Sequence, residues 1–88
     1  MNEKFEYKNI TTGATTVVKS GTGVLKAITV NSTAAGTITV YDNTSAAGTK
    51  IATLKASVVE GTYEYNIAFA TGLTIVTGAA SDITVSYR

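Results

Sequence analysis

The sequence predicts an all-β protein: a single antiparallel β-sandwich or jelly-roll-like domain of about seven to eight short strands. From Thr15 to Arg88 the chain consists of short segments rich in Thr, Val and Ile, in which every second residue is apolar. A half-buried strand requires this period of two, because successive side chains point to opposite faces of a sheet. Turn-forming residues separate the segments about every 8 to 14 residues, a spacing that favours a sandwich over units with helical connections.

The first twelve residues differ from the rest of the chain. They contain four of the thirteen charged residues, together with Phe5 and Tyr7. In an extended segment Phe5 and Tyr7 share one face and Glu6 and Lys8 the other, which is typical of a segment that docks one side on a neighbour. We therefore divide the chain into residues 1–12, an N-terminal arm or peripheral strand, and residues 13–88, the β-sandwich domain. A frayed terminus is the alternative for residues 1–12.

Seven segments after residue 12 are predicted strands. Each places β-branched or aromatic residues at alternate positions and is followed by residues that favour turns. In chain order they are Thr15–Ser20, Gly23–Asn31, Thr37–Asn43, Lys50–Ser57, Thr62–Ala70, Leu73–Thr77 and Asp82–Arg88.

The clearest alternation lies in Thr62–Ala70, and we expect this strand to form the centre of the core. Its inward face is predicted to carry Tyr63, Tyr65, Ile67 and Phe69. Other strands are expected to supply matching inward residues, namely Val24, Ile28, Val30, Ile38, Val40, Leu73, Ile75, Ile83, Val85 and Tyr87.

Lys26 interrupts the alternation of the second predicted strand. Its aliphatic stem can lie along the apolar surface with the ammonium group in solvent. Alternatively, the strand contains a bulge that turns Leu25 and Ala27 inward. The sequence leaves both interpretations open.

The composition restricts the chemistry that we expect of the chain. It contains no His, Cys, Pro or Trp. Disulfides and ordinary transition-metal sites need Cys or His, and general acid-base catalysis near neutral pH relies mainly on His. We therefore predict no catalytic residue, no cofactor, no metal site and no enzymatic activity. Two carboxylate pairs are interpreted as surface and turn residues: Asp42 with Asp82, and Glu60 with Glu64.

Charge and length predict the kind of partner. The net charge is +1 and the lysines are scattered, whereas nucleic-acid binding usually shows a concentrated basic patch. The charged first residues are unlike a secretory signal, and no segment approaches the roughly 20 apolar residues of a membrane helix. A domain of 88 residues without disulfides or metal gains stability by association. We expect a homo-oligomer or a docked subunit, with no nucleic acid and no membrane as partner.

Three aromatic residues are the candidate partner contacts: Phe5, Tyr7 and Tyr41. Tyr41 is predicted on the face opposite to Ile38 and Val40, where it would serve in a subunit contact or as a platform for a sugar. The sheet edges, which lack proline, are either protected by lysines or paired with residues 1–12 of a neighbour.

Several segments resemble small virion proteins of tailed bacteriophages. They are Val17–Leu25, Ile28–Asn31, Gly36–Asn43, Gly48–Ala52, Thr71–Leu73 and Asp82–Arg88, so that the resemblance covers about the last seventy-five residues. These phage proteins are compact β-sandwich modules of heads and their appendages, including decoration or cement proteins and fibre-associated proteins.

The resemblance implies a head decoration or cement subunit that binds the major capsid protein or another virion protein, often as a trimer. It implies a location in the virion, after synthesis in the host cytoplasm, and no catalytic residues. The alternative is a receptor- or glycan-binding module of a head or tail fibre, with Tyr41 in a shallow site.

Overall fold

The computed structural model describes residues 4–88, and within this range it contains eight β-strands and no helix. The strands are β1 (Glu6–Ile10), β2 (Thr15–Ser20), β3 (Gly23–Ser32), β4 (Ile38–Asp42), β5 (Thr49–Leu54), β6 (Gly61–Phe69), β7 (Gly72–Thr77) and β8 (Asp82–Tyr87). The last seven lie where the alternation predicted them, and β1 lies within the predicted arm. Residues 1–3 of that arm fall outside the described residues. No helix long and apolar enough to cross a membrane occurs in residues 4–88.

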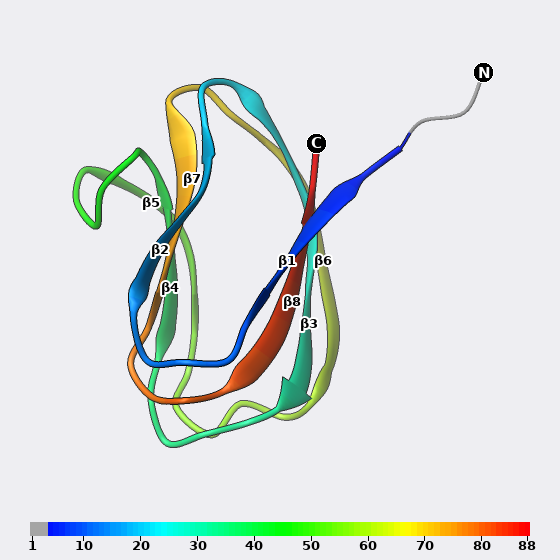
Figure 1. Ribbon diagram of the computed structural model, residues 1–88, viewed down its shortest axis with the longest axis vertical. Helices are drawn as coiled ribbons and strands as arrows, with labels where there is room; N and C mark the ends of the chain where they lie inside the picture. The colour runs from blue at the N-terminus through cyan, green and yellow to red at the C-terminus, as the bar shows by residue number, and fades with distance from the viewer. Residues whose placement is uncertain (1–3) are drawn as a thin grey trace.

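The strands form two antiparallel four-stranded sheets that pack face to face (Figure 1). The first sheet has the order β1-β8-β3-β6 and the second β2-β7-β4-β5. The chain passes from one sheet to the other at every connection except the β4–β5 hairpin. Strands pair as β1 with β8, β2 with β7, β3 with β6 and β4 with β5. This is the pairing of a jelly roll, so the predicted fold class is confirmed.

The core lies between the sheets and is built mainly from the central strands β3, β8, β4 and β7. These strands are covered on their inner faces, which is where the alternation placed their β-branched residues. The largest fully buried apolar side chains are Phe69, Leu25, Ile28, Ile38, Leu73, Ile75, Ile83, Val30, Val40 and Val85.

The expectation that Thr62–Ala70 forms the centre of the core is wrong. β6 is the edge strand of the first sheet; Tyr63 and Tyr65 are half-buried, and Ile67 is 37% exposed. Only Phe69, at the end of the strand, is fully buried. Alternation reports which face of a strand is apolar, but it does not report whether the strand lies at the centre or the edge of its sheet.

The interruption at Lys26 is a bulge. The registers of β3 with β8 and with β6 both shift between Leu25 and Ala27, and both of these side chains are buried. Val24, which strict alternation places inward, is only half-buried. The second of the two interpretations of Lys26 is therefore confirmed, because the extra residue reverses the inside-outside phase of the strand at this point.

Candidate functional site

Phe5 and Tyr7 lie together at the N-terminal end of β1, an edge strand of the first sheet. Tyr7 is on β1 and pairs with Ser86 of β8, while Phe5 directly precedes the strand. Both residues have the parity of the outer face, which points away from the core. Tyr7 is 73% exposed and Phe5 39% exposed, so this end of the outer face presents two accessible aromatic side chains.

Two cationic side chains lie close to the ring of Phe5. The guanidinium Cζ of Arg88 is 5.1 Å from the centre of the ring, and the Nζ of Lys26 is 5.9 Å from it. A cation within about 6 Å of an aromatic ring is attracted by the electrons of its face. Lys26 also donates a hydrogen bond of 3.1 Å to Oδ1 of Asn66 on β6. Phe5 is thereby held against Lys26 of β3 and against Arg88, which directly follows β8.

A ladder of polar side chains continues along the outer face beyond Tyr7. The Nδ2 of Asn9 donates to Oδ1 of Asp82 and to the carbonyl oxygen of Ile83, both at 2.8 Å. The Nδ2 of Asn31 donates to the same Asp82 oxygen at 3.2 Å and to Oγ1 of Thr84 at 3.1 Å. These bonds tie β1 and β3 to β8, and they hold the strand that carries Tyr7 in place.

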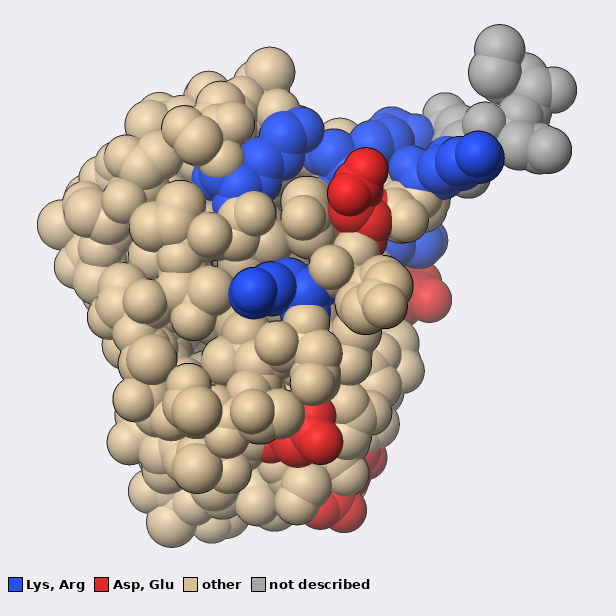
Figure 2. All heavy atoms as spheres, in the orientation of Figure 1, with Lys and Arg blue, Asp and Glu red and all other residues tan. Residues whose placement is uncertain are grey.

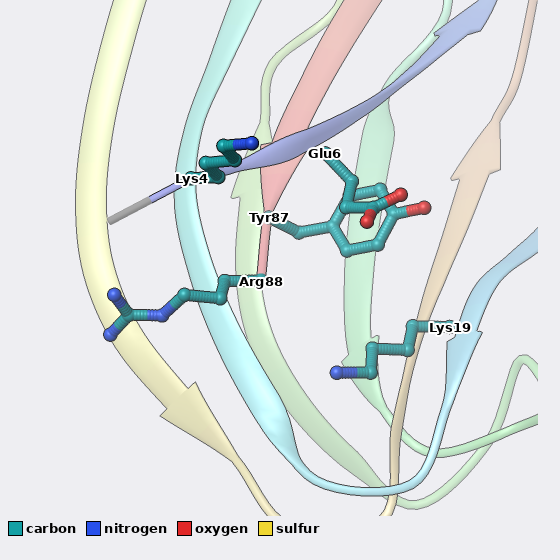
Figure 3. Close-up of a pocket in the computed structure, with 5 residues that line it drawn as sticks. All are labelled: Lys4, Glu6, Lys19, Tyr87 and Arg88. Atoms are coloured by element: carbon teal, nitrogen blue, oxygen red, sulfur yellow. The ribbon is translucent and has the colours of Figure 1, made fainter. Parts of the chain in front are cut away.

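A shallow depression of about 420 Å³ lies beside β1, at the same end of the molecule. It is lined by Lys4, Glu6, Lys19, Tyr87 and Arg88. Figure 3 shows Glu6 and Tyr87 pointing toward β2, from which Lys19 extends, while Arg88 points the other way. Three cations and one carboxylate give this region a positive charge, and Figure 2 shows basic side chains gathered at the end of the molecule where the chain begins.

Tyr41 lies on the second sheet, apart from Phe5 and Tyr7. It pairs with Thr74 of β7 and Lys50 of β5, and it is half-buried on the face opposite to Val40. The parity predicted from the sequence is confirmed. The three candidate contacts nevertheless belong to two separate surfaces, because β1 and β4 are in different sheets.

Asp42 binds the turn between β6 and β7. Its Oδ1 accepts hydrogen bonds from the backbone N–H groups of Thr71 at 2.8 Å and Gly72 at 3.3 Å, and Oδ2 accepts from that of Ala70 at 3.0 Å. These amides, chiefly those of Ala70 and Thr71, hold the pKa of Asp42 below its ordinary value of 3.8. The predicted turn role of Asp42 takes this form: its carboxylate braces a neighbouring turn.

Replacing Asp42 with asparagine is expected to remove part of the acid sensitivity of the fold. Because the pKa of Asp42 is lowered in the folded state, its contribution is present above pH 3.8 and is lost as the pH falls through the lower, folded value. Urea unfolding from about pH 6 to about pH 2 measures this effect. Glu64→Gln on the exposed face of β6 is the control, and equal acid sensitivity of wild type and Asp42→Asn would contradict the bracing role.

Asp82 and Glu60 are also engaged in local structure. Asp82 binds Asn9 and Asn31 at the end of the sandwich opposite to Asp42, so these two carboxylates, interpreted from the sequence as surface and turn residues, lie apart. Glu60 accepts a 3.1 Å hydrogen bond from the backbone N–H of Thr33. In residues 4–88 no group of three or more His, Cys, Asp or Glu side chains is placed to hold a metal ion.

On the inner side of β6, burial raises the pKa of Tyr65 above its ordinary value of 10.0, and the nearby Tyr63 adds to the shift. The hydroxyl of Tyr63 donates to the carbonyl oxygen of Val59. Both tyrosines are thus engaged in packing at the edge of the core.

Comparison with known proteins adds no relative: no protein-family model, no curated protein and no solved structure matches this chain. The functional interpretation therefore rests on the geometry of the outer face of the first sheet. It offers aromatic rings, cations and hydrogen-bonding groups, which are the means of adhesion to another surface.

Sequence reasoning did not find the polar ladder or the two cations beside Phe5. The ladder had a signal, because Thr29 and Asn31 alternate with buried residues on β3, as Asp82 and Thr84 do on β8. Such alternating Asn, Asp and Thr residues indicate an outer face rich in hydrogen-bonding groups. The two cations beside Phe5 had no such signal in the sequence. Lys26 and Arg88 lie near Phe5 only because β8 and β3 follow β1 in the order of the first sheet.

Proposed function

We propose that this chain is a structural subunit of a bacteriophage particle that decorates the assembled head and stabilises it through protein–protein contacts. Two considerations support the proposal. Segments from Val17 to Arg88 resemble small phage virion proteins. The jelly roll is an architecture that viral capsid domains share with lectins and cupins. The fold alone does not define a function, so the proposal depends on the residues that the surface presents.

The observation that carries the proposal is the exposed aromatic end of β1. Tyr7 leaves 73% of its surface exposed, and next to it the ring of Phe5 contacts Lys26 and Arg88. Tyrosine and arginine are enriched at the centres of protein interfaces, where an aromatic ring contributes a large contact area and a polar group. The polar ladder that begins at Asn9 provides the hydrogen-bonding rim that such a contact needs.

The partner in this proposal is the major capsid protein or another virion protein, and the location is the virion. The subunit carries out no reaction and binds no cofactor. The resemblance to phage proteins implies association of the copies as trimers.

Replacing Tyr7 with alanine is expected to weaken binding to heads about tenfold or more, the loss typical of truncating an interfacial tyrosine. The measurement is co-sedimentation of purified protein with heads of the encoding phage that lack this protein. Val59→Ala is the matched control, because Val59 is 71% exposed in the loop before β6, at the opposite end of the sandwich. Unchanged binding by Tyr7→Ala, or no binding by the wild-type protein, would refute the proposal.

The alternative function is a receptor- or glycan-binding module of a head or tail fibre, with a site at Tyr41. Tyr41 is half-buried beside Thr74 and Lys50, so it offers a smaller platform than Tyr7. Saturable binding on a glycan array that is lost in Tyr41→Ala would favour this alternative over head decoration.

A further inference from the structure

β1 is the one edge strand in residues 4–88 whose pairing is regular throughout. The edges of the two sheets are formed by β1, β6, β2 and β5. Register shifts place an extra residue at Val18 in β2, at Ile51 in β5 and next to Lys26 in β6, where Asn66 has a φ of 54°. β1 pairs with β8 over five consecutive residues without a shift. Bulges protect sheet edges from pairing with another chain, so β1 is the edge that is left without this protection.

The side chains of β1 separate into a charged face and an aromatic face. Glu6 and Lys8 share the side that faces the second sheet, whereas Tyr7 and Asn9 lie on the outer face. Each of these four side chains is exposed, and of the four only that of Asn9 makes a side-chain hydrogen bond within residues 4–88. Charges on the core-facing side of an edge strand block pairing with an arbitrary strand. Glu6 and Lys8, however, have opposite charges. A strand that places a cation opposite Glu6 and an anion opposite Lys8 can still pair with β1.

We propose that two copies of this chain pair through β1, antiparallel and edge to edge, so that two four-stranded sheets join into one continuous sheet. The register places Tyr7 opposite Tyr7 of the second copy. Glu6 then faces Lys8 of the second copy, and Lys8 faces Glu6 of the second copy. The contact therefore contains two opposite-charge pairs on one face and an aromatic pair on the other, and both kinds of cross-strand pair are stabilising.

Charge complementarity selects this register and this partner. A shift of the register by two residues in one direction places Glu6 opposite Glu6 of the second copy. The same shift in the other direction places Lys8 opposite Lys8, so both shifted registers bring like charges together. A shift by one residue brings the aromatic face of one copy onto the charged face of the other. A partner strand must carry the charge order of β1 to meet these conditions in the antiparallel direction, and β1 of a second copy has that order, so we assign the occupant as a second copy.

The inference goes beyond the proposed function and does not depend on it. A two-fold contact of this kind closes after two copies, so it makes a dimer instead of the trimer that the resemblance implies. Side chains stand perpendicular to a sheet, so both Tyr7 rings remain on the outer surface of the joined sheet, side by side. Association also gives this small domain the additional buried surface that its length demands.

A charge-exchange experiment tests the pairing in the full chain. Glu6→Lys gives β1 two lysines on its charged face, and Lys8→Glu gives it two carboxylates. Each variant alone faces like charges in the dimer, and each is expected to raise the dimer dissociation constant about tenfold or more. The double variant E6K/K8E restores opposite charges and is expected to dimerise like the wild type. Analytical ultracentrifugation over a range of concentrations measures these constants.

Mixing the two single variants gives a sharper readout, because an E6K copy and a K8E copy complement each other. An equimolar mixture is expected to form a heterodimer that neither variant forms with itself. Glu64→Lys on β6 is the matched control, since it makes the same change of charge on the opposite edge, and it is expected to leave the dimer intact.

The proposal is overturned if the wild-type protein remains monomeric at all concentrations, or if E6K and K8E associate as strongly as the wild type. A wild-type trimer also overturns it. Failure of head binding with an intact, charge-dependent dimer would refute the proposed function and leave this pairing standing.

Discussion

Replacing Phe69 with alanine is expected to lower the free energy of unfolding by about 3 to 5 kcal/mol, the cost typical of deleting a buried phenylalanine ring. Phe69 is 1% exposed and is the largest fully buried side chain of the core. Its ring packs against Gly23 at the end of the sandwich, where a cavity would form on truncation. Because small domains have total stabilities of only about 0.05 to 0.15 kcal/mol per residue, this single change removes a large share of the stability.

Ile67→Ala is the control for this prediction. Ile67 lies two residues before Phe69 on the same strand, but it is 37% exposed, so its truncation removes less buried surface and leaves no closed cavity. Equilibrium urea unfolding of the three proteins compares the losses. If Phe69→Ala loses no more stability than Ile67→Ala, the end of the core is not packed as described.

The strands were predictable because alternation is a local property of the chain. β2 begins and ends at the predicted residues, Thr15 and Ser20, and the other segments differ by a few residues at their ends. The order of the strands in each sheet was not predictable, since it depends on pairing between distant segments. β6 shows the consequence: its alternation is the clearest in the sequence, yet the strand lies at an edge.

The burial of two threonines on β7 shows the same limit. Thr74 has the parity opposite to Leu73 and Ile75 and looks like an outward residue in the sequence, whereas Thr77 shares their inward parity; both threonines are buried. The hydroxyl of Thr74 donates to the carbonyl oxygen of Asn43 at 2.7 Å, and that of Thr77 donates to the carbonyl oxygen of Thr12 at 2.6 Å. Loops far away in the sequence cover these hydroxyls and satisfy them, which is why the burial of Thr74 on the outward parity has no local signal.

The candidate site was predictable to the extent that it depends on parity. Phe5 and Tyr7 lie on one face of an extended segment, as alternation requires. The separation of Tyr41 from them depends on the assignment of β1 and β4 to different sheets, which no local pattern reports. The placement of Lys26 and Arg88 around Phe5 likewise follows from the neighbouring positions of β8 and β3 in the first sheet.

Replacing Gly23 with alanine is expected to cost about 3 kcal/mol or more, at the upper end of the range for overpacked sites. A Cβ atom at this position would lie 2.3 Å from the carbonyl oxygen of Arg88 and 2.6 Å from Cζ of Phe69. The Arg88 carbonyl cannot move freely, because it accepts a 2.7 Å hydrogen bond from the backbone N–H of Val24. Gly13→Ala is the comparison: its Cβ would lie 3.3 Å from backbone atoms of Ala79, a tight contact without the overlap at Gly23, so a smaller loss of stability is expected.

The double variant Gly23→Ala with Phe69→Leu separates the two contacts. Leucine lacks the ring atoms that meet the new methyl group, so it relieves the clash with the side chain but leaves the clash with the Arg88 carbonyl. The loss of stability in the double variant is therefore expected to be smaller than the sum of the single losses by about 0.5 kcal/mol or more, as for residues in direct contact. Strict additivity in urea unfolding would show that the Phe69 ring does not rest on Gly23, whereas a shortfall places the ring, the glycine and the end of β8 in one packed unit.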